Sequence, residues 1–130
     1  MIVVDSSVWI DNLRNADTAA VRKLQALGPD GTEVLIGDLI LLEVLQGARD
    51  ALHAARIERN LRRFPIAPML GADLAVRAAE NYRFLRSRGI TVRKTADLII
   101  GTFCMVRDHL LLHNDRDFEP MAAHLGLQLA

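Results

Sequence analysis

Short apolar runs alternate along this sequence with longer stretches whose apolar residues recur at helical spacing. The runs bounded by polar residues, glycine or proline predict strands at residues 1–4, 33–36, 65–68, 109–113 and 127–129. Apolar residues three or four positions apart predict helices at residues 8–13, 17–27, 39–46, 50–64, 73–88, 95–106 and 118–125. Strands that alternate with helices favour an α/β fold in which helices flank a central parallel sheet.

Glycines and short polar side chains mark the ends of these elements. The sequence Gly-Pro-Asp-Gly at residues 28–31 predicts a turn after the second helix, and Gly47 and Gly89 follow the third and fifth helices. Several helix starts carry a side chain that can accept a hydrogen bond from the first turn: Ser6 or Ser7, Asp38 and Thr95. We expect these residues to be N-caps.

The length and composition predict one globular domain covering residues 1–130. No apolar run approaches the ~18 residues of a membrane span, and no basic segment precedes an apolar stretch at the N-terminus. We therefore expect a cytoplasmic protein that does not contact a membrane. The single cysteine, Cys104, stands in an apolar stretch, which predicts a buried free thiol.

Five acidic residues stand where the predicted fold brings chain segments together: Asp5, Glu43, Asp97, Asp115 and Asp117. Three of them follow predicted strands, and Asp97 lies in the first turn of an apolar helix. Ligands of open α/β sheets bind beyond the carboxyl ends of the strands, so we expect the acids to share one site. Asp97 could instead offset a helix dipole, and Glu43 could reach water from the edge of its otherwise apolar helix.

The acidic cluster predicts a divalent metal, because like charges in one cleft repel unless a cation lies between them. Carboxylate oxygens suit Mg²⁺ or Mn²⁺. A metal held in this way lowers the pKa of bound water and steadies the charge on a phosphodiester under attack, which is nuclease chemistry. No zinc site is expected, since His53, His109 and His124 have no acidic or cysteine partner at metal-ligand spacing.

Arginines gather in two segments although the formal net charge of the chain is zero: residues 49–63 and 83–93. Guanidinium groups suit phosphate and carboxylate alike. A solvated helix face would explain either group equally well.

Four blocks of this sequence, in this order, resemble the VapC-type toxins, which are PIN-domain ribonucleases. They are Ile-Val-Val-Asp-Ser-Ser-Val-Trp-Ile at 2–10, Leu-Glu-Val-Leu-Gln-Gly at 42–47, Thr-Ala-Asp-Leu-Ile-Ile at 95–100 and His-Asn-Asp-Arg-Asp-Phe at 113–118. The resemblance spans almost the whole chain. It implies a PIN-like three-layer α/β fold and an Mg²⁺-dependent endoribonuclease that serves as the toxin of a type II (VapBC) module and cleaves RNA by attack of metal-activated water.

The resemblance also implies roles for individual residues. The catalytic and metal-binding acids would be Asp5, Glu43, Asp97 and Asp115, with Mn²⁺ as a possible substitute for Mg²⁺. The supporting residues would be Ser6, Ser7, Asn114 and Asp117. The arginines expected to contact RNA phosphates are Arg56, Arg59, Arg62 and Arg93. The implied partners are RNA, a VapB-type antitoxin and a second copy of the toxin.

One residue departs from this pattern. Many members carry a small hydroxyl residue at the position of His113. We interpret His113 as a local variant, with a phosphate-contacting or proton-handling group as the alternative.

Two other classes of protein remain as alternatives. A metal-dependent phosphohydrolase or phosphoacceptor domain also places acids at strand ends, but it usually has paired acids after the first strand and a lysine after a later strand. Here Asp5 is followed by two serines, and Lys94 precedes a helix. A PIN-like RNA-binding or regulatory module without cleavage would be favoured by an incomplete acidic set, and this set is complete.

Overall fold

A four-stranded parallel sheet forms the centre of the chain. The computed structural model describes residues 1–27 and 33–130, so the turn predicted at residues 28–31 lies outside the described residues. The strands are β1 (Ile2–Val4), β2 (Val34–Gly37), β3 (Ile66–Ala67) and β4 (Leu110–Leu112). Their order across the sheet is β3-β2-β1-β4.

The position of β1 between β2 and β4 determines where a ligand can bind. Ile2 pairs with Val34 of β2 on one side and with Leu110 of β4 on the other. The chain adds β2 and β3 on one side of β1 and then returns to place β4 on the other side. The carboxyl ends of β1 and β4 therefore flank a topological switch point, which is where open α/β sheets bind ligands.

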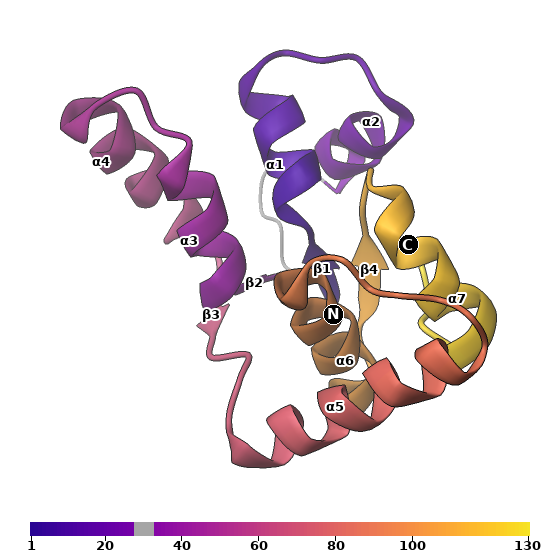
Figure 1. Cartoon of the computed structure of the whole chain (residues 1–130). Helices are drawn as coiled ribbons and strands as arrows, with labels where there is room; N and C mark the ends of the chain where they lie inside the picture. The colour runs from indigo at the N-terminus through magenta and orange to yellow at the C-terminus, as the bar shows by residue number, and fades with distance from the viewer. Residues whose placement is uncertain (28–32) are drawn as a thin grey trace.

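In the described residues, seven α-helices surround the sheet (Figure 1). They are α1 (Ser6–Leu13), α2 (Ala19–Ala26), α3 (Asp38–Gln46), α4 (Ala51–Leu61), α5 (Ala72–Ser87), α6 (Thr95–Arg107) and α7 (Glu119–Leu125), and a 3₁₀ turn, η1 (Arg116–Phe118), precedes α7. In Figure 1, α3 and α4 form an arm on the left, α5 runs along the lower edge, and α6 lies between α5 and the strands. The predicted α/β fold with a parallel sheet flanked by helices is confirmed.

The apolar helix α6 belongs to the core, as its sequence predicts. Ile100 and Cys104 have no exposed surface, and burial raises the pKa of the Cys104 thiol to about 12. Gly101 lets α7 come close, because a Cβ at this position would overlap Met121. Since η1 and α7 follow β4, this packing places the end of β4 near the start of α6.

The helix starts differ from the predicted caps. Asp5, and not Ser6 or Ser7, is the N-cap of α1, and its carboxylate accepts a hydrogen bond from the Ser7 backbone N–H. Helix α6 has Lys94 at its N-cap position without a side-chain cap bond, so the prediction for Thr95 was wrong.

Strand β2 runs directly into α3, which changes the role of Asp38. Gly37 occupies the N-cap position, where a Cβ would overlap Met69. Asp38 is the first residue of α3, and its Oδ1 accepts from the backbone N–H groups of Leu39 (2.8 Å) and Met69 (3.1 Å). Asp38 thus joins the start of α3 to the segment that follows β3.

The chain ends beside β4. The strand predicted at residues 127–129 is reduced to one parallel bridge between Leu111 and Leu129. The helix predicted from residue 118 begins one residue later, because Phe118 lies in η1. Within residues 1–27 and 33–130, no helix has both the length and the apolar character to cross a membrane.

Candidate metal centre

Asp5 lies at the base of the site, directly beyond β1. Only 3% of its surface is exposed, and its Oδ2 accepts hydrogen bonds from the Ser7 backbone N–H (3.0 Å) and the Ser7 hydroxyl (2.6 Å). Burial raises the pKa of Asp5, and the hydrogen bonds from Ser7 oppose this rise. Its other oxygen, Oδ1, is buried and has no hydrogen-bond partner among the described residues.

The loop after β4 is held against the start of α1. The backbone N–H of Asn114 donates to the Ser7 hydroxyl (3.1 Å), and the Asn114 side chain donates to Asp11 Oδ2 (2.9 Å). The Ser7 hydroxyl therefore connects Asp5 with the loop that carries the next two acids. Ser7 and Asn114 thus hold this loop against the start of α1.

Three carboxylates converge where this loop meets the start of α6. Asp97, Asp115 and Asp117 each offer an oxygen, and these oxygens all lie within 4.8 Å of one another. Asp115 Oδ1 also accepts from the backbone N–H of Asp117 (3.0 Å), which fixes the two loop acids relative to each other. The sequence predicts a supporting role for Asp117. In the structure, its carboxylate lies in one group with those of Asp97 and Asp115.

Asp97 is buried at the start of α6, with 4% of its surface exposed. Its pKa is raised to about 7, first by burial and then by the negative charges of Asp5 and Asp115. The Asp97 oxygen Oδ2, like Asp5 Oδ1, is buried without a partner in the described part of the chain. Offsetting a helix dipole does not account for an acid that is buried among other acids.

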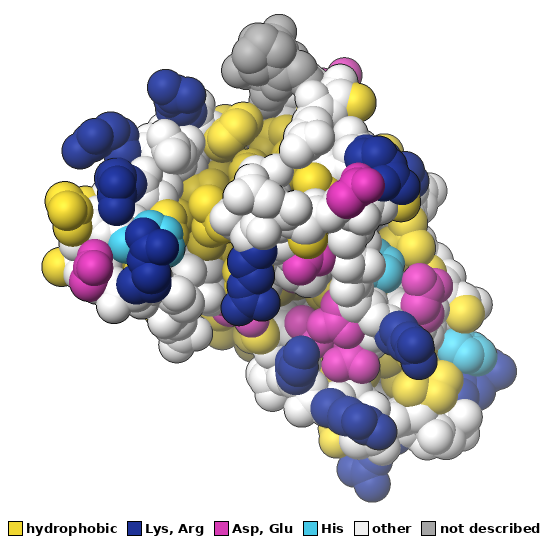
Figure 2. All heavy atoms as spheres, turned by 90° about the horizontal axis from the view of Figure 1, so that it is seen from above, with side chains coloured by type: hydrophobic (Ala, Val, Ile, Leu, Met, Phe, Trp, Pro, Cys, Tyr) yellow, Lys and Arg dark blue, Asp and Glu magenta, His cyan; other side chains and the backbone are white. Residues whose placement is uncertain are grey.

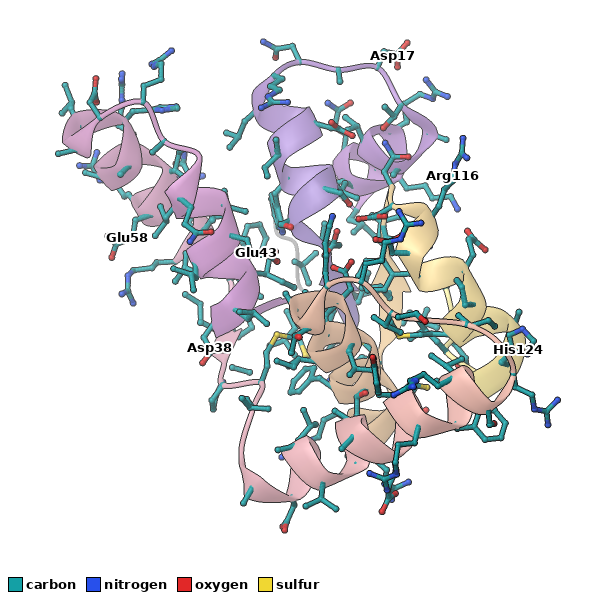
Figure 3. All side chains as sticks on the ribbon, viewed as in Figure 1. Asp17, Asp38, Glu43, Glu58, Arg116 and His124 are labelled. Atoms are coloured by element: carbon teal, nitrogen blue, oxygen red, sulfur yellow. The ribbon has the colours of Figure 1, made fainter. Side chains whose placement is uncertain are left out.

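Glu43 approaches the group from α3 (Figure 3). It is half-buried, and its Oε1 accepts from the Ser6 hydroxyl at 3.2 Å. Burial raises the pKa of Glu43, and the charge of Asp5 raises it further. Ser6 directly follows Asp5, so this hydrogen bond holds Glu43 beside the site. Glu43 is not one of the three acids whose oxygens lie within 4.8 Å of one another.

These residues fit a hard divalent cation. All of the converging donors are carboxylate oxygens, the ligands that Mg²⁺ and Mn²⁺ prefer. Two buried carboxylate oxygens, one each on Asp5 and Asp97, have no donor among residues 1–27 and 33–130, and leaving such atoms unpaired is costly. A cation held by these carboxylates would offset the repulsion that, after burial, raises the pKa of Asp97.

Lys94 is a site residue that our reading of the sequence missed. Its ammonium group lies 3.5 Å from Asp115 Oδ2, and the negative charges of Asp115 and Asp97 raise its pKa. One signal was available: Lys94 is one of two lysines in the chain and directly precedes the predicted helix whose first turn contains Asp97.

The predicted RNA-binding arginines do not converge with the acids. Arg56, Arg59 and Arg62 are exposed and belong to α4 or its end, and Arg62 pairs with Glu58 at 2.7 Å. Arg93 is exposed just before α6. Figure 2 shows acidic side chains gathered in the middle of one face, with basic side chains around them and a separate basic group over the arm.

Comparison with known proteins decides the family. A family model described as "PIN domain" matches residues 2–123. The chain belongs to the PIN-domain family. Curated relatives of this PIN domain include "VapC ribonuclease Mb1587" of Mycobacterium bovis and "Ribonuclease VapC11" of Mycobacterium tuberculosis. Each is 31% identical over 134 residues, which cover 100% of this chain and 98% of the relative, so the PIN domain is of the VapC type.

Solved structures share the fold of this PIN domain. A VapBC2 complex from Rickettsia felis, bound to a DNA fragment from its promoter, matches with a TM-score of 0.78 and 17% identity over 100% of this chain and 98% of the other. VapC20 of Mycobacterium tuberculosis, described as a sarcin-ricin loop cleaving toxin, matches with a TM-score of 0.69 and 20% identity over 95% of each chain. At these identities, the likeness establishes the fold.

Asp97→Asn should stabilise the metal-free PIN domain at pH 8. The pKa of Asp97 is about 7 in the folded chain, against an ordinary value of 3.8. At a pH between these two values, the folded state therefore holds a proton that the unfolded chain has released. Stability from this group therefore falls as the pH rises through that window and stays low above it. We expect the variant to melt about 2–5 °C above the wild type at pH 8 in EDTA, with the difference shrinking toward pH 4.

The matched control is Asp73→Asn, which removes an exposed acid from the first turn of α5. Its melting temperature should follow that of the wild type at every pH. An Asp97→Asn variant that melts at or below the wild-type temperature at pH 8 would contradict the burial argument.

Proposed function

We propose that this PIN domain is a metal-dependent endoribonuclease and the toxin of a VapBC-type toxin–antitoxin pair. The observation that carries the proposal is the convergence of Asp97, Asp115 and Asp117, together with buried oxygens of Asp5 and Asp97 that meet no donor in the described part of the chain. The curated VapC ribonucleases, 31% identical over their length, support the same activity.

The acids have two roles in this proposal, metal binding and proton acceptance. Asp5, Asp97, Asp115 and Asp117 would hold Mg²⁺, or Mn²⁺ in its place. When bound, the ion would lower the pKa of water beside the phosphodiester and offset the charge that builds during attack. Glu43 is placed to take the proton of the attacking water, since Ser6 occupies Oε1 and leaves Oε2 for the proton. Burial, and then the charge of Asp5, raises the pKa of Glu43, which makes its carboxylate a stronger proton acceptor.

Cleavage of RNA tests the proposal directly. The purified chain, free of any partner, should cleave RNA with Mg²⁺ or Mn²⁺ and not with EDTA. Asp5→Asn and Asp97→Asn should each lower the rate by ~100-fold or more, because each removes a charged ligand. Asp73→Asn, away from the site, should cleave as the wild type does.

Two other outcomes would replace the proposal. RNA binding without cleavage at any metal concentration would indicate a PIN-like RNA-binding or regulatory module. Hydrolysis of a small phosphomonoester, such as p-nitrophenyl phosphate, without cleavage of RNA would indicate a phosphohydrolase.

The arginines outside the acidic group are proposed as phosphate contacts. Arg56 and Arg59 are free to meet RNA on the exposed side of α4, whereas Arg62 already pairs with Glu58. Arg93 directly precedes Lys94, which pairs with Asp115.

Replacing Arg56, Arg59 and Arg62 with alanine should lower the salt dependence of RNA binding. The slope of log K against log salt concentration should become shallower by ~2. An unchanged slope would indicate that these arginines only form a solvated helix face.

A groove between α1 and the α3–α4 arm is proposed as the antitoxin site. A pocket of about 200 Å³ there is lined by Trp9, Leu13 and Phe64 among others. The Trp9 indole N–H is buried and meets no acceptor in the described residues. An antitoxin segment with an apolar side chain and a carbonyl or carboxylate acceptor would fill the pocket and satisfy this donor.

Leu13→Glu should weaken binding of the VapB-type antitoxin by ~10-fold or more, because it places a charge in an apolar groove. The control is Leu52→Glu, which adds the same charge at an exposed position of α4. Isothermal titration calorimetry measures both affinities. Equal affinities for the two variants would place the antitoxin elsewhere.

A second copy of the chain is proposed to cover an apolar face formed by α3, α5 and α6. Two hollows on this face, of about 480 and 220 Å³, share Leu70 and Ile99, and Leu70 and Leu42 are 55% and 52% exposed. Arg83 lines the larger hollow and Asp38 the smaller one, so the face carries opposite charges, which suits a contact related by a two-fold axis. Sedimentation should show a dimer for the wild type and Leu52→Glu and a monomer for Leu42→Glu.

A further inference from the structure

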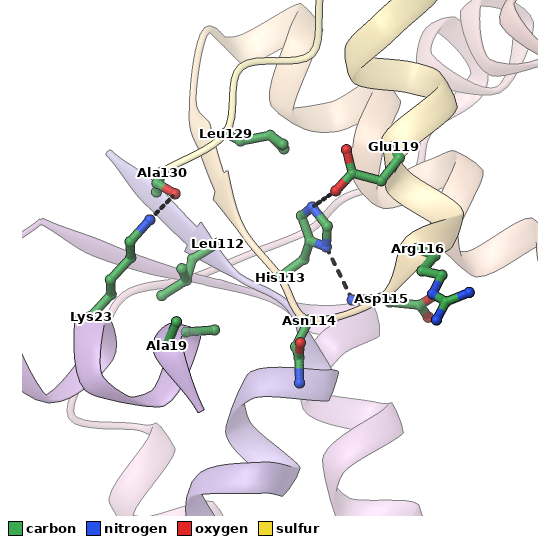
Figure 4. Close-up of a pocket in the computed structure, with 11 residues that line it drawn as sticks. Ala19, Lys23, Leu112, His113, Asn114, Asp115, Arg116, Glu119, Leu129 and Ala130 are labelled. Atoms are coloured by element: carbon green, nitrogen blue, oxygen red, sulfur yellow. Dashed lines mark hydrogen bonds and ion pairs between the residues drawn. The ribbon is translucent and has the colours of Figure 1, made fainter. Parts of the chain in front are cut away.

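His113 has a defined place in the loop that carries two of the acids. It follows β4 directly, and only 9% of its side chain is exposed. Its Nδ1 accepts a hydrogen bond from the backbone N–H of Asp115 at 3.0 Å (Figure 4). The ring packs against the fully buried Phe118, with 5.1 Å between ring centroids. The imidazole is therefore fixed by packing as well as by a hydrogen bond.

This hydrogen bond determines which nitrogen carries the proton. A nitrogen that accepts from a backbone N–H cannot hold a proton itself, so the ring proton lies on Nε2. Nε2 lies 3.7 Å from Glu119 Oε1, an acceptor on the opposite side of the ring. The backbone of Asp115 and the carboxylate of Glu119 thus select one tautomer and one ring orientation.

The same kind of hydrogen bond recurs through the site. Asp5 accepts from the N–H of Ser7, His113 from that of Asp115, and Asp115 from that of Asp117, each two residues further along the chain. The last two bonds share Asp115, which donates to His113 in the first and accepts from Asp117 in the second. His113 thus orients the peptide of Asp115, and Asp115 in turn orients the peptide of Asp117.

We propose that His113 is a positioning residue of the metal centre, which aims the carboxylates of Asp115 and Asp117 at Asp97 through the Nδ1 hydrogen bond. The inference rests on the proposed metal-dependent function and goes further, since it gives a role to the residue interpreted from the sequence as a local variant. Direct contact with the reacting phosphate is disfavoured, because Nδ1 is engaged by the loop and Nε2 faces Glu119.

Substitutions at residue 113 separate this role from simple packing. Asparagine keeps an acceptor oxygen near the Nδ1 position and makes the same turn with the N–H two residues on. Glutamine carries its acceptor one bond too far for this turn, and leucine fills the space without an acceptor. The control is His124→Leu, which replaces an exposed histidine on α7.

Binding of Mn²⁺ to the chain without RNA, measured by calorimetry, is the first readout. His113→Leu and His113→Gln should bind Mn²⁺ about 10–100-fold more weakly than the wild type. His113→Asn should stay within ~3-fold of it, and His124→Leu should match it. Wild-type affinity in a folded His113→Leu or His113→Gln variant would overturn the inference.

Nitrogen NMR of the His113 ring is the second readout and needs no variant. It should show a protonated Nε2 and an unprotonated Nδ1, and a proton on Nδ1 would overturn the inference even if His113→Leu fails to fold. Wild-type chain that binds Mn²⁺ but does not cleave RNA would overturn the proposed nuclease and leave the role of His113 intact. Wild-type chain that binds no Mn²⁺ would overturn both.

Discussion

The Ser7 hydroxyl makes the pair of hydrogen bonds on which the site depends. It donates to Asp5 beyond β1 and accepts from the backbone of Asn114 beyond β4, so it joins the two loops at the switch point of the sheet. This bridge is possible because β1 and β4 are neighbours, although more than 100 residues separate Ser7 from Asn114. The strand order thus brings the loops together, and one hydroxyl sets their relative position.

Concentrating acids at this point costs the metal-free chain stability. Burial raises the pKa of Asp5, Glu43 and Asp97, which means that their charged forms are disfavoured where they lie. Lys94 offsets part of the repulsion, but it is exposed, and its ion pair is with Asp115 at 3.5 Å. A cation bound among the acids would therefore stabilise the fold as well as supply chemistry. The same unfavourable charges that weaken the empty site favour metal binding.

The sequence was sufficient for the fold class and for the neighbourhood of the acids. Asp5 and Asp115 follow strands and Asp97 lies in the first turn of an apolar helix, and such positions depend on local pattern alone. The finer arrangement depends on contacts between distant segments, which a local pattern does not contain. Periodicity could not show that the Ser7 hydroxyl reaches Asn114 and not the helix N-terminus, nor that Lys94 lies beside Asp115. The central place of Asp117 likewise follows from a turn closed by hydrogen bonds to His113 and Asp115.

The acids differ in how rigidly the chain holds them. Asp5, Asp115 and Asp117 sit in short turns closed by hydrogen bonds between residues two apart, so their geometry is local and survives small movements of the helices. Glu43 comes from α3, and its hydrogen bond within the site is the one from Ser6. Movement of the α3–α4 arm would change the position of Glu43 while the other acids keep theirs. A partner in the proposed groove between α1 and this arm would therefore change the position of Glu43 more than that of the other acids.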